Sequence, residues 1–130
     1  MKRTITTLCL AICCMAISAQ GIMKKLPDNT YVVNTSELCQ ARGFKDKTPI
    51  EVYIKSGKVV KIETLQNKET PKYFKIVKSK YIPKFIGLKI SNALGLAKEP
   101  KCDGCTGATF SAKAIQQNIK SALEYYKKNK

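Results

Sequence analysis

The chain is short, strongly basic and free of histidine. Its 130 residues are enough for one small domain. Lysine and arginine number 24 against 9 acidic residues, which gives a formal net charge of +15. Such a charge favours acidic partners, anionic membrane surfaces or nucleic acid, but no recognised nucleic-acid motif is present. The lack of histidine, together with the absence of a nucleophile–base pattern, argues against an enzyme.

The N-terminus has the order of a secretory signal. Lys2 and Arg3 precede an uncharged apolar run at 8–17, and small residues follow up to Ala19. The run is too short to cross a bilayer comfortably. We therefore predict a signal peptide over 1–19, cleavage before Gln20, and a periplasmic protein or one on the outer face of the inner membrane. An uncleaved anchor is the alternative, and export argues further against a nucleic-acid partner.

Three cysteines remain after the predicted cleavage. Cys39, Cys102 and Cys105 form an odd number, so an oxidising compartment allows at most one internal disulfide. Three thiols without histidine argue against a zinc site, so we predict no metal. Haem attachment at Cys102-x-x-Cys105 fails because Thr106 stands where histidine is needed.

The first part of the mature chain shows few regular elements. Residues 20–30 are polar, lysine-rich and interrupted by Pro27, which predicts a lead-in linker before a domain over 31–130. Tyr31-Val32-Val33 predicts a first short strand. Residues 39–48 have no clear period and are predicted to be a loop.

Residues 50–63 predict a β-hairpin, because apolar and polar side chains alternate on both sides of Ser56-Gly57. A two-residue loop at Ser56-Gly57 would divide the apolar side chains between the two faces. A three-residue loop that begins at Lys55 keeps them together and places Gly57 at a left-handed position. The predicted register therefore pairs Val52 with Val60 and Ile50 with Ile62.

Residues 71–98 predict one or two short helices. Pro71 is a suitable first helical residue, and Pro83 interrupts the segment after the first helix. We expect a turn near Gly87 and an irregular stretch from Gly95 to Pro100.

The last segment predicts an amphipathic helix. One face is apolar, with Ala112, Ile115, Ile119, Ala122, Leu123 and Tyr126; the other is polar, with Lys113, Gln116, Gln117, Lys120 and Glu124. The predicted fold class is α+β: a small antiparallel sheet with this C-terminal helix and one or two shorter helices.

A glycine-containing turn over residues 103–111 leads directly into that helix. Thr109 or Ser111 can cap the helix through its side-chain oxygen. Free backbone N–H groups and the positive end of the helix dipole make such a turn a seat for phosphate. By themselves the residues indicate an anion site or a bare helix cap.

The same turn resembles a specific motif. Asp103-x-x-Thr106-Gly107-Ala108-Thr109 matches every defined position of Asp-x-x-(Ser/Thr)-Gly-Ala-Thr. This is the flavinylation motif of the FMN-binding domain family, which includes the C subunit of the sodium-translocating quinone reductase and the G subunit of the related ferredoxin oxidoreductase. Ser56-Gly57-Lys58 and Glu69-Thr70-Pro71 are similar to further family segments. The resemblance covers about residues 30–126.

The resemblance implies a covalent flavin. A flavin transferase would take FAD and join its FMN half to Thr109 by a phosphoester bond, with Asp103, Thr106, Gly107 and Ala108 as the segment that it recognises. Glu69 and Thr70 are expected close to the flavin. The protein would then be an exported electron carrier and not an enzyme, working with redox partner proteins associated with the membrane.

Two alternatives and three departures accompany this hypothesis. The chain could bind FMN noncovalently in the same fold, or serve without flavin as a basic adaptor for a membrane surface or an acidic partner. Thr106 replaces the commoner serine of the motif, and Phe110 could pack on flavin or on the core. Cys102 and Cys105 interleave with the motif as a structural disulfide or as a redox-active pair.

Overall fold

A computed structural model describes residues 21–98 and 108–130. The predictions for the signal peptide over 1–19, and for the part of the motif turn before Ala108, lie outside these ranges. The residues outside the described ranges include Cys102, Asp103, Cys105, Thr106 and Gly107.

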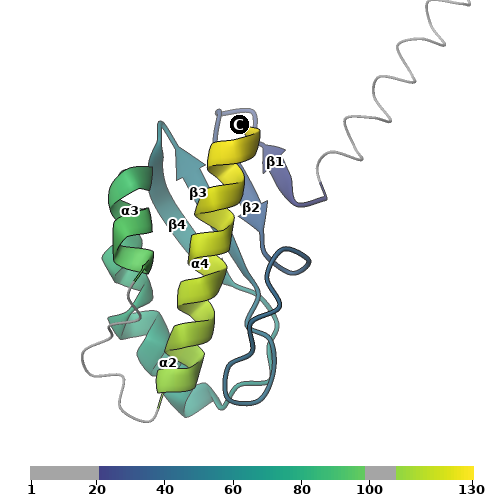
Figure 1. The fold of residues 1–130 in the computed structure, drawn as a ribbon, viewed down its shortest axis with the longest axis vertical. Coiled ribbons are helices and arrows are strands. Elements are labelled where there is room, and N and C mark those ends of the chain that lie inside the picture. Colours follow the sequence, from purple (N-terminus) through teal and green to yellow (C-terminus); the bar gives the residue numbers. More distant parts are fainter. Residues whose placement is uncertain (1–20, 99–107) are drawn as a thin grey trace, which may run out of the picture.

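The described chain forms one four-stranded sheet and a set of helices (Figure 1). The sheet runs β1-β2-β3-β4, every neighbouring pair antiparallel. Its strands are β1 (Met23–Lys25), β2 (Tyr31–Asn34), β3 (Ile50–Lys55) and β4 (Lys58–Thr64). The helices are α2 (Pro71–Lys80), the 3₁₀ turn η1 (Ile82–Phe85), α3 (Ile90–Ala97) and α4 (Thr109–Asn129). The predicted α+β class is confirmed.

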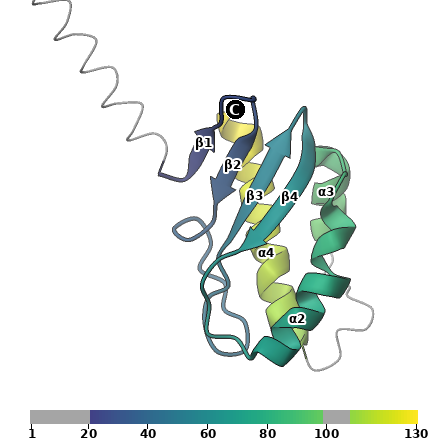
Figure 2. The same cartoon turned by 180° about the vertical axis from the view of Figure 1, so that it is seen from behind.

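The core lies between the sheet and α4. In the view from behind, the strands stand in front of α4, and α2 and α3 lie to one side (Figure 2). Val52 and Ile54 of β3 and Ile115, Ile119 and Leu123 of α4 are all fully buried. This two-layer arrangement buries one face of the sheet and one stripe of the helix.

The segment predicted to be a linker contains β1, which pairs with β2 and places Met23 opposite Val33. The linker prediction is therefore wrong for Met23–Lys25. The sequence did not indicate this strand, because three residues without an apolar alternation carry little strand signal. The strand predicted at residues 31–33 is confirmed but is second in the sheet. The predicted loop at 39–48 is confirmed, closed by an isolated bridge between Arg42 and Lys47.

The predicted hairpin is present, but its turn differs from the prediction. Lys55 pairs with Lys58 across a two-residue turn at Ser56-Gly57. Both turn residues have positive φ angles, 53° at Ser56 and 72° at Gly57, as the type I′ turn requires. The predicted three-residue loop is therefore wrong. The predicted pairings of Val52 with Val60 and of Ile50 with Ile62 are also wrong, since Val52 lies opposite Ile62 and Ile50 lies opposite Thr64.

A β-bulge at Val60 explains the difference. Ile54 lies opposite Val59, whereas Val52 lies opposite Ile62, so that Val60 is the extra residue on β4. Val59 is fully buried and Val60 is 45% exposed. The bulge lets a two-residue turn keep Val59 and Ile62 on one face, an option that strict alternation does not offer.

The predictions for residues 71–87 are confirmed. α2 begins at Pro71, and Pro83 falls within η1. Gly87 has a φ angle of 87°, as a turn glycine does.

α3 corrects the next prediction. The stretch expected to be irregular from Gly95 is helical as far as Ala97. Ile90, Ala93 and Ala97 are the buried residues of α3, a helical spacing that holds it against α4 and β4. The small size of alanine hides this stripe in the sequence.

α4 confirms the predicted apolar face, since all six of its residues are buried. The prediction that Gln116 lies on the polar face is wrong. Gln116 is buried, and its Nε2 donates a hydrogen bond to the Ala97 carbonyl. Asn118 is also buried, and its Oδ1 accepts a 2.5 Å hydrogen bond from the Thr35 hydroxyl. These amides tie α4 to α3 and to the loop before β3.

Tyr81 provides a stability prediction. Its side chain is fully buried, and its hydroxyl has no hydrogen-bond partner among the described residues. Burial raises the pKa of this hydroxyl to about 12. Leaving a buried polar group unsatisfied costs about 1–3 kcal/mol, so we expect Tyr81→Phe to raise the free energy of unfolding by about 1–2 kcal/mol in urea denaturation. Tyr73→Phe, at an exposed ring, should change it by less than about 0.5 kcal/mol. A less stable Tyr81→Phe protein would show that the hydroxyl has a partner.

Candidate functional site

Thr109 lies at the N-terminus of the longest helix. It is the first residue of α4, it is exposed, and Ala108 before it is the N-cap. The predicted cap by Thr109 or Ser111 is wrong, because neither side chain caps the helix. The Ser111 hydroxyl instead donates a 2.6 Å hydrogen bond to Glu69 Oε1. Thr109 is exposed, and the described residues give its hydroxyl no hydrogen-bond partner.

The first turn of α4 favours an anion beside Thr109. The N–H groups of Thr109, Phe110 and Ser111 have no acceptor four residues earlier within the helix. The helix also presents the positive end of its dipole there. A phosphate held at Thr109 would lie in this favourable field.

A pocket of about 210 Å³ lies against the same turn. It is lined by Phe44, Thr70, Tyr73, Ala108, Phe110 and Ser111. These residues come from the loop before β3, the start of α2 and the start of α4, which meet at one end of the molecule (Figure 1).

The pocket wall is unusually aromatic for a surface. Phe44 is 70% exposed, Phe110 63% and Tyr73 40%. The ring centroids of Phe44 and Phe110 are 6.3 Å apart, with an interplanar angle of 36°. A cluster of exposed apolar side chains on a protein surface commonly marks a binding site. Phe110 therefore faces the pocket and not the core.

Glu69 joins the three segments behind this wall. Its Oε1 accepts hydrogen bonds from the Phe44 N–H at 2.7 Å and the Ser111 hydroxyl at 2.6 Å. Its Oε2 accepts from the Lys45 N–H at 2.7 Å. A Cβ at Gly43 would lie 1.9 Å from Glu69 Oε1, so only glycine lets the carboxylate sit this close. Glu69 thus attaches the loop that contains Phe44 to the first turn of α4.

The hydrogen bonds also determine the protonation of Glu69. Burial raises its pKa, but the Ser111 hydroxyl and the backbone N–H groups of Lys45 and Phe44 outweigh burial, and the pKa lies below its ordinary value. A lowered pKa in the folded state stabilises the fold above the unfolded-state pKa, and this stabilisation is lost as the pH falls through the folded value.

We therefore expect the free energy of unfolding to fall below about pH 4.3, the ordinary glutamate pKa. Glu69→Gln should show a flatter fall, since its amide does not titrate. Urea denaturation of both proteins between about pH 6 and pH 3 measures this difference. Equal slopes would show that other carboxyl groups cause the acid sensitivity.

The structure brings together the predicted site residues that it describes. Thr70 and Ala108 line the pocket, Thr109 adjoins it, and Glu69 lies behind it. Phe44 and Tyr73 were missed, because an isolated aromatic residue in a loop or at a helix start carries no sequence signal.

Other predicted features leave few marks on the described ranges. There, no three histidine, cysteine, aspartate or glutamate side chains gather as a metal site would need. None of the helices in these ranges has the length and apolar character to cross a bilayer. Cys39 is the one cysteine in the described ranges, and it is partly exposed.

Fold and site define a small α+β domain with an exposed threonine at a helix N-terminus beside an aromatic pocket. A family model described as FMN-binding domain matches residues 43–124. The chain belongs to this family, and it is an FMN-binding flavoprotein module. The match begins at Gly43 and includes Glu69, the aromatic pocket and Thr109. No curated protein matches the chain.

Proposed function

We propose that this protein is an exported electron carrier in which FMN is joined to Thr109 by a phosphoester bond. The observation that carries the proposal is the position of Thr109: exposed, at the N-terminus of a 21-residue helix and beside a pocket with three exposed aromatic rings. The residues fit FMN, because the helix end favours a phosphate and the rings offer apolar surface to a planar ring system.

Attachment requires a separate flavin transferase with FAD as donor. The Thr109 oxygen forms the new bond to the FMN phosphorus, the phosphoanhydride bond of FAD breaks, and AMP leaves. In this proposal the hydroxyl proton goes to a base of the transferase. The motif residues Asp103, Thr106, Gly107 and Ala108 would be what the transferase recognises.

The described residues of the pocket and of the first turn of α4 then have roles in holding the flavin. The first turn of α4 stabilises the phosphate through its N–H groups, and Phe44, Phe110 and Tyr73 exclude water from the ring. Thr70 and Ser111 supply the polar edge of the pocket. When bound, FMN accepts and donates one or two electrons. A covalent tether keeps the flavin at high effective concentration outside the cytoplasm, where a dissociated flavin would be diluted.

The carrier would exchange electrons with membrane-associated redox partner proteins in the periplasm or at the outer face of the inner membrane. An open pocket rimmed by exposed rings suits this role, because a partner can approach the flavin directly.

Denaturing electrophoresis tests the proposal against its alternatives. We expect a protein co-expressed with a flavin transferase to give a fluorescent flavin band that survives denaturation. Flavin absorbance in the native protein without a fluorescent band would identify the noncovalent module. Neither signal, with the transferase shown active on another substrate, would leave a flavin-free adaptor.

A further inference from the structure

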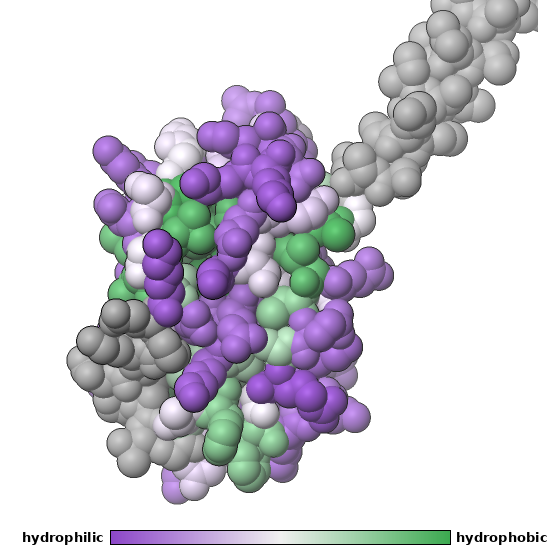
Figure 3. Space-filling model, in the orientation of Figure 1, coloured by the Kyte–Doolittle hydropathy of each residue, from purple (hydrophilic) through white to green (hydrophobic). Residues whose placement is uncertain are grey.

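The end of the molecule opposite the flavin pocket is rich in lysine. α4 has 21 residues and so spans about 30 Å, and Thr109 begins it at the pocket end. At its other end seven exposed lysines gather, which we call the lysine end: Lys25, Lys55, Lys58, Lys89, Lys127, Lys128 and Lys130. Hydrophilic side chains cover this end in the space-filling view, around the last turns of α4 (Figure 3).

Aromatic contacts join two of these lysines. The ring of Tyr31 on β2 packs edge-to-face on Tyr126 of α4, with centroids 5.3 Å apart. Lys25 Nζ lies 5.6 Å from the Tyr31 centroid, and Lys130 Nζ lies 5.4 Å from the Tyr126 centroid. The first strand pair and the end of α4 therefore present their charges together.

The hairpin continues the same surface. Lys55 pairs with Lys58 across the turn, and Lys58 forms an isolated bridge with Lys89 just before α3. Within the described ranges, the one ion pair at the lysine end joins Lys55 to Asp28 at 3.6 Å. The lysines of α4 form none there, so most of this charge is free to meet an anion.

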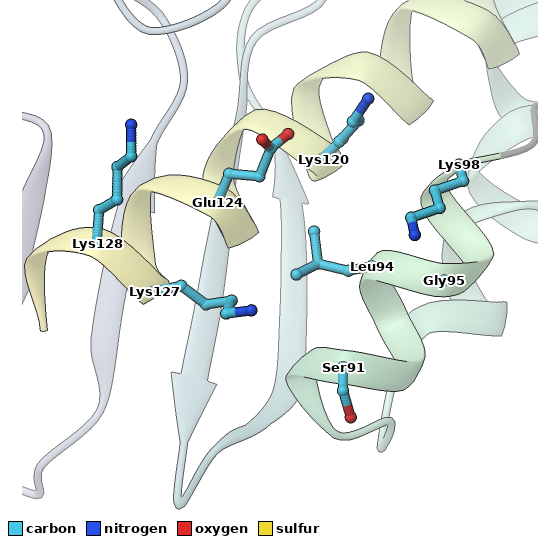
Figure 4. Close-up of a pocket in the computed structure, with 8 residues that line it drawn as sticks. All are labelled: Ser91, Leu94, Gly95, Lys98, Lys120, Glu124, Lys127 and Lys128. Atoms are coloured by element: carbon cyan, nitrogen blue, oxygen red, sulfur yellow. The ribbon is translucent and has the colours of Figure 1, made fainter.

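A groove of about 500 Å³ lies between α3 and α4 and reaches the lysine end at Lys127 and Lys128. It is lined by Ser91, Leu94, Gly95, Lys98, Lys120, Glu124, Lys127 and Lys128. Figure 4 shows Leu94 projecting from α3 toward α4, with Lys98 and Lys127 extending toward it from opposite sides. The groove thus sets the apolar side chain of Leu94 beside the ammonium groups of four lysines. These outnumber the single carboxylate of Glu124, so an anionic headgroup is favoured there.

We propose that the lysine end binds an anionic membrane surface, with the groove between α3 and α4 seating a headgroup phosphate. A membrane fits better than a redox partner, because Lys127 lies about 27 Å along α4 from Thr109. A partner docked here would be remote from the flavin pocket. A membrane needs no access to the pocket, and this orientation leaves the pocket facing away from the lipid. Binding does not depend on flavin, so its test is independent of the proposed function.

The test is vesicle co-sedimentation of the mature protein, purified after processing in its host. Mass spectrometry identifies its N-terminal residue. Vesicles of phosphatidylcholine with phosphatidylglycerol are compared with pure phosphatidylcholine. The test variant carries Lys120→Gln, Lys127→Gln and Lys128→Gln. The matched control carries Lys72→Gln, Lys75→Gln and Lys78→Gln on the exposed face of α2, with the same change in net charge. Glutamine preserves helix propensity in both, and circular dichroism checks that both fold.

We expect the native protein to bind the anionic vesicles and to be released as salt rises. Each lysine near an anionic surface strengthens binding about fivefold, so the test variant should lose about 100-fold in affinity. The control should lose less than about threefold, since its lysines lie beyond a Debye length from the membrane. Equal losses would overturn the proposal by assigning binding to net charge alone. Equal binding to both vesicle types would also overturn it.

Discussion

Glu69→Ala is expected to lower the free energy of unfolding by about 2–4 kcal/mol. The carboxylate accepts hydrogen bonds from the Phe44 and Lys45 N–H groups and the Ser111 hydroxyl, and only 6% of Glu69 is exposed. Alanine leaves all three donors without this acceptor and releases the loop that carries Phe44. Urea denaturation at neutral pH measures the loss.

Glu63→Ala is the matched control, because it removes the same side chain from an exposed ion pair. Glu63 lies 2.9 Å from Lys61, and both side chains are about half exposed. Exposed pairs contribute little, so a loss of about 0.2–1 kcal/mol is expected. Similar losses for the two variants would contradict the organising role of Glu69.

Gly43→Ala is expected to destabilise the protein by about 2–3 kcal/mol although it adds only one methyl group. That methyl carbon would lie 1.9 Å from Glu69 Oε1 and 3.2 Å from Thr48 Cγ2. Either the loop or the carboxylate must move, and both movements stretch the hydrogen bonds that place Phe44. Thermal or urea unfolding gives the size of the effect.

Gly95→Ala makes the same chemical change where nothing opposes it. Gly95 lies inside α3, and a Cβ there would meet no atom of another described segment within 4 Å. Because glycine weakens a helix interior relative to alanine, this variant should gain about 0.5–1 kcal/mol. Opposite signs at the two glycines are the expected result. A neutral effect at Gly43 would show that Glu69 has room to shift.

Much of the fold follows from side-chain periodicity. The buried stripe of α4 repeats at helical spacing over 15 residues, long enough to be recognised from residues 112–126 alone. The hairpin register could not be predicted from periodicity, because a bulge at Val60 changes the phase of the alternation within one strand. Gln116 was misplaced because its amide finds the Ala97 carbonyl, a partner that only the packing of α3 on α4 supplies.

The candidate site divides in the same way. Thr109 could be singled out from the sequence because the motif is local and stands at the start of a predicted helix. Glu69 could be singled out by resemblance, but its contacts reach Phe44 and Ser111, 25 and 42 residues away. The aromatic wall depends on three segments that meet only in the folded chain, so local patterns could not indicate Phe44 or Tyr73.

Intact mass spectrometry of the mature protein, co-expressed with a flavin transferase, tests the central claim most directly. We predict a gain of one FMN less one water in the native chain, and no gain in Thr109→Ala. Ser111→Ala, which removes the neighbouring hydroxyl of the same turn, should keep the added mass. An unmodified native chain, beside a transferase that modifies another substrate, would contradict covalent attachment. The same added mass in Thr109→Ala would place the flavin on another residue.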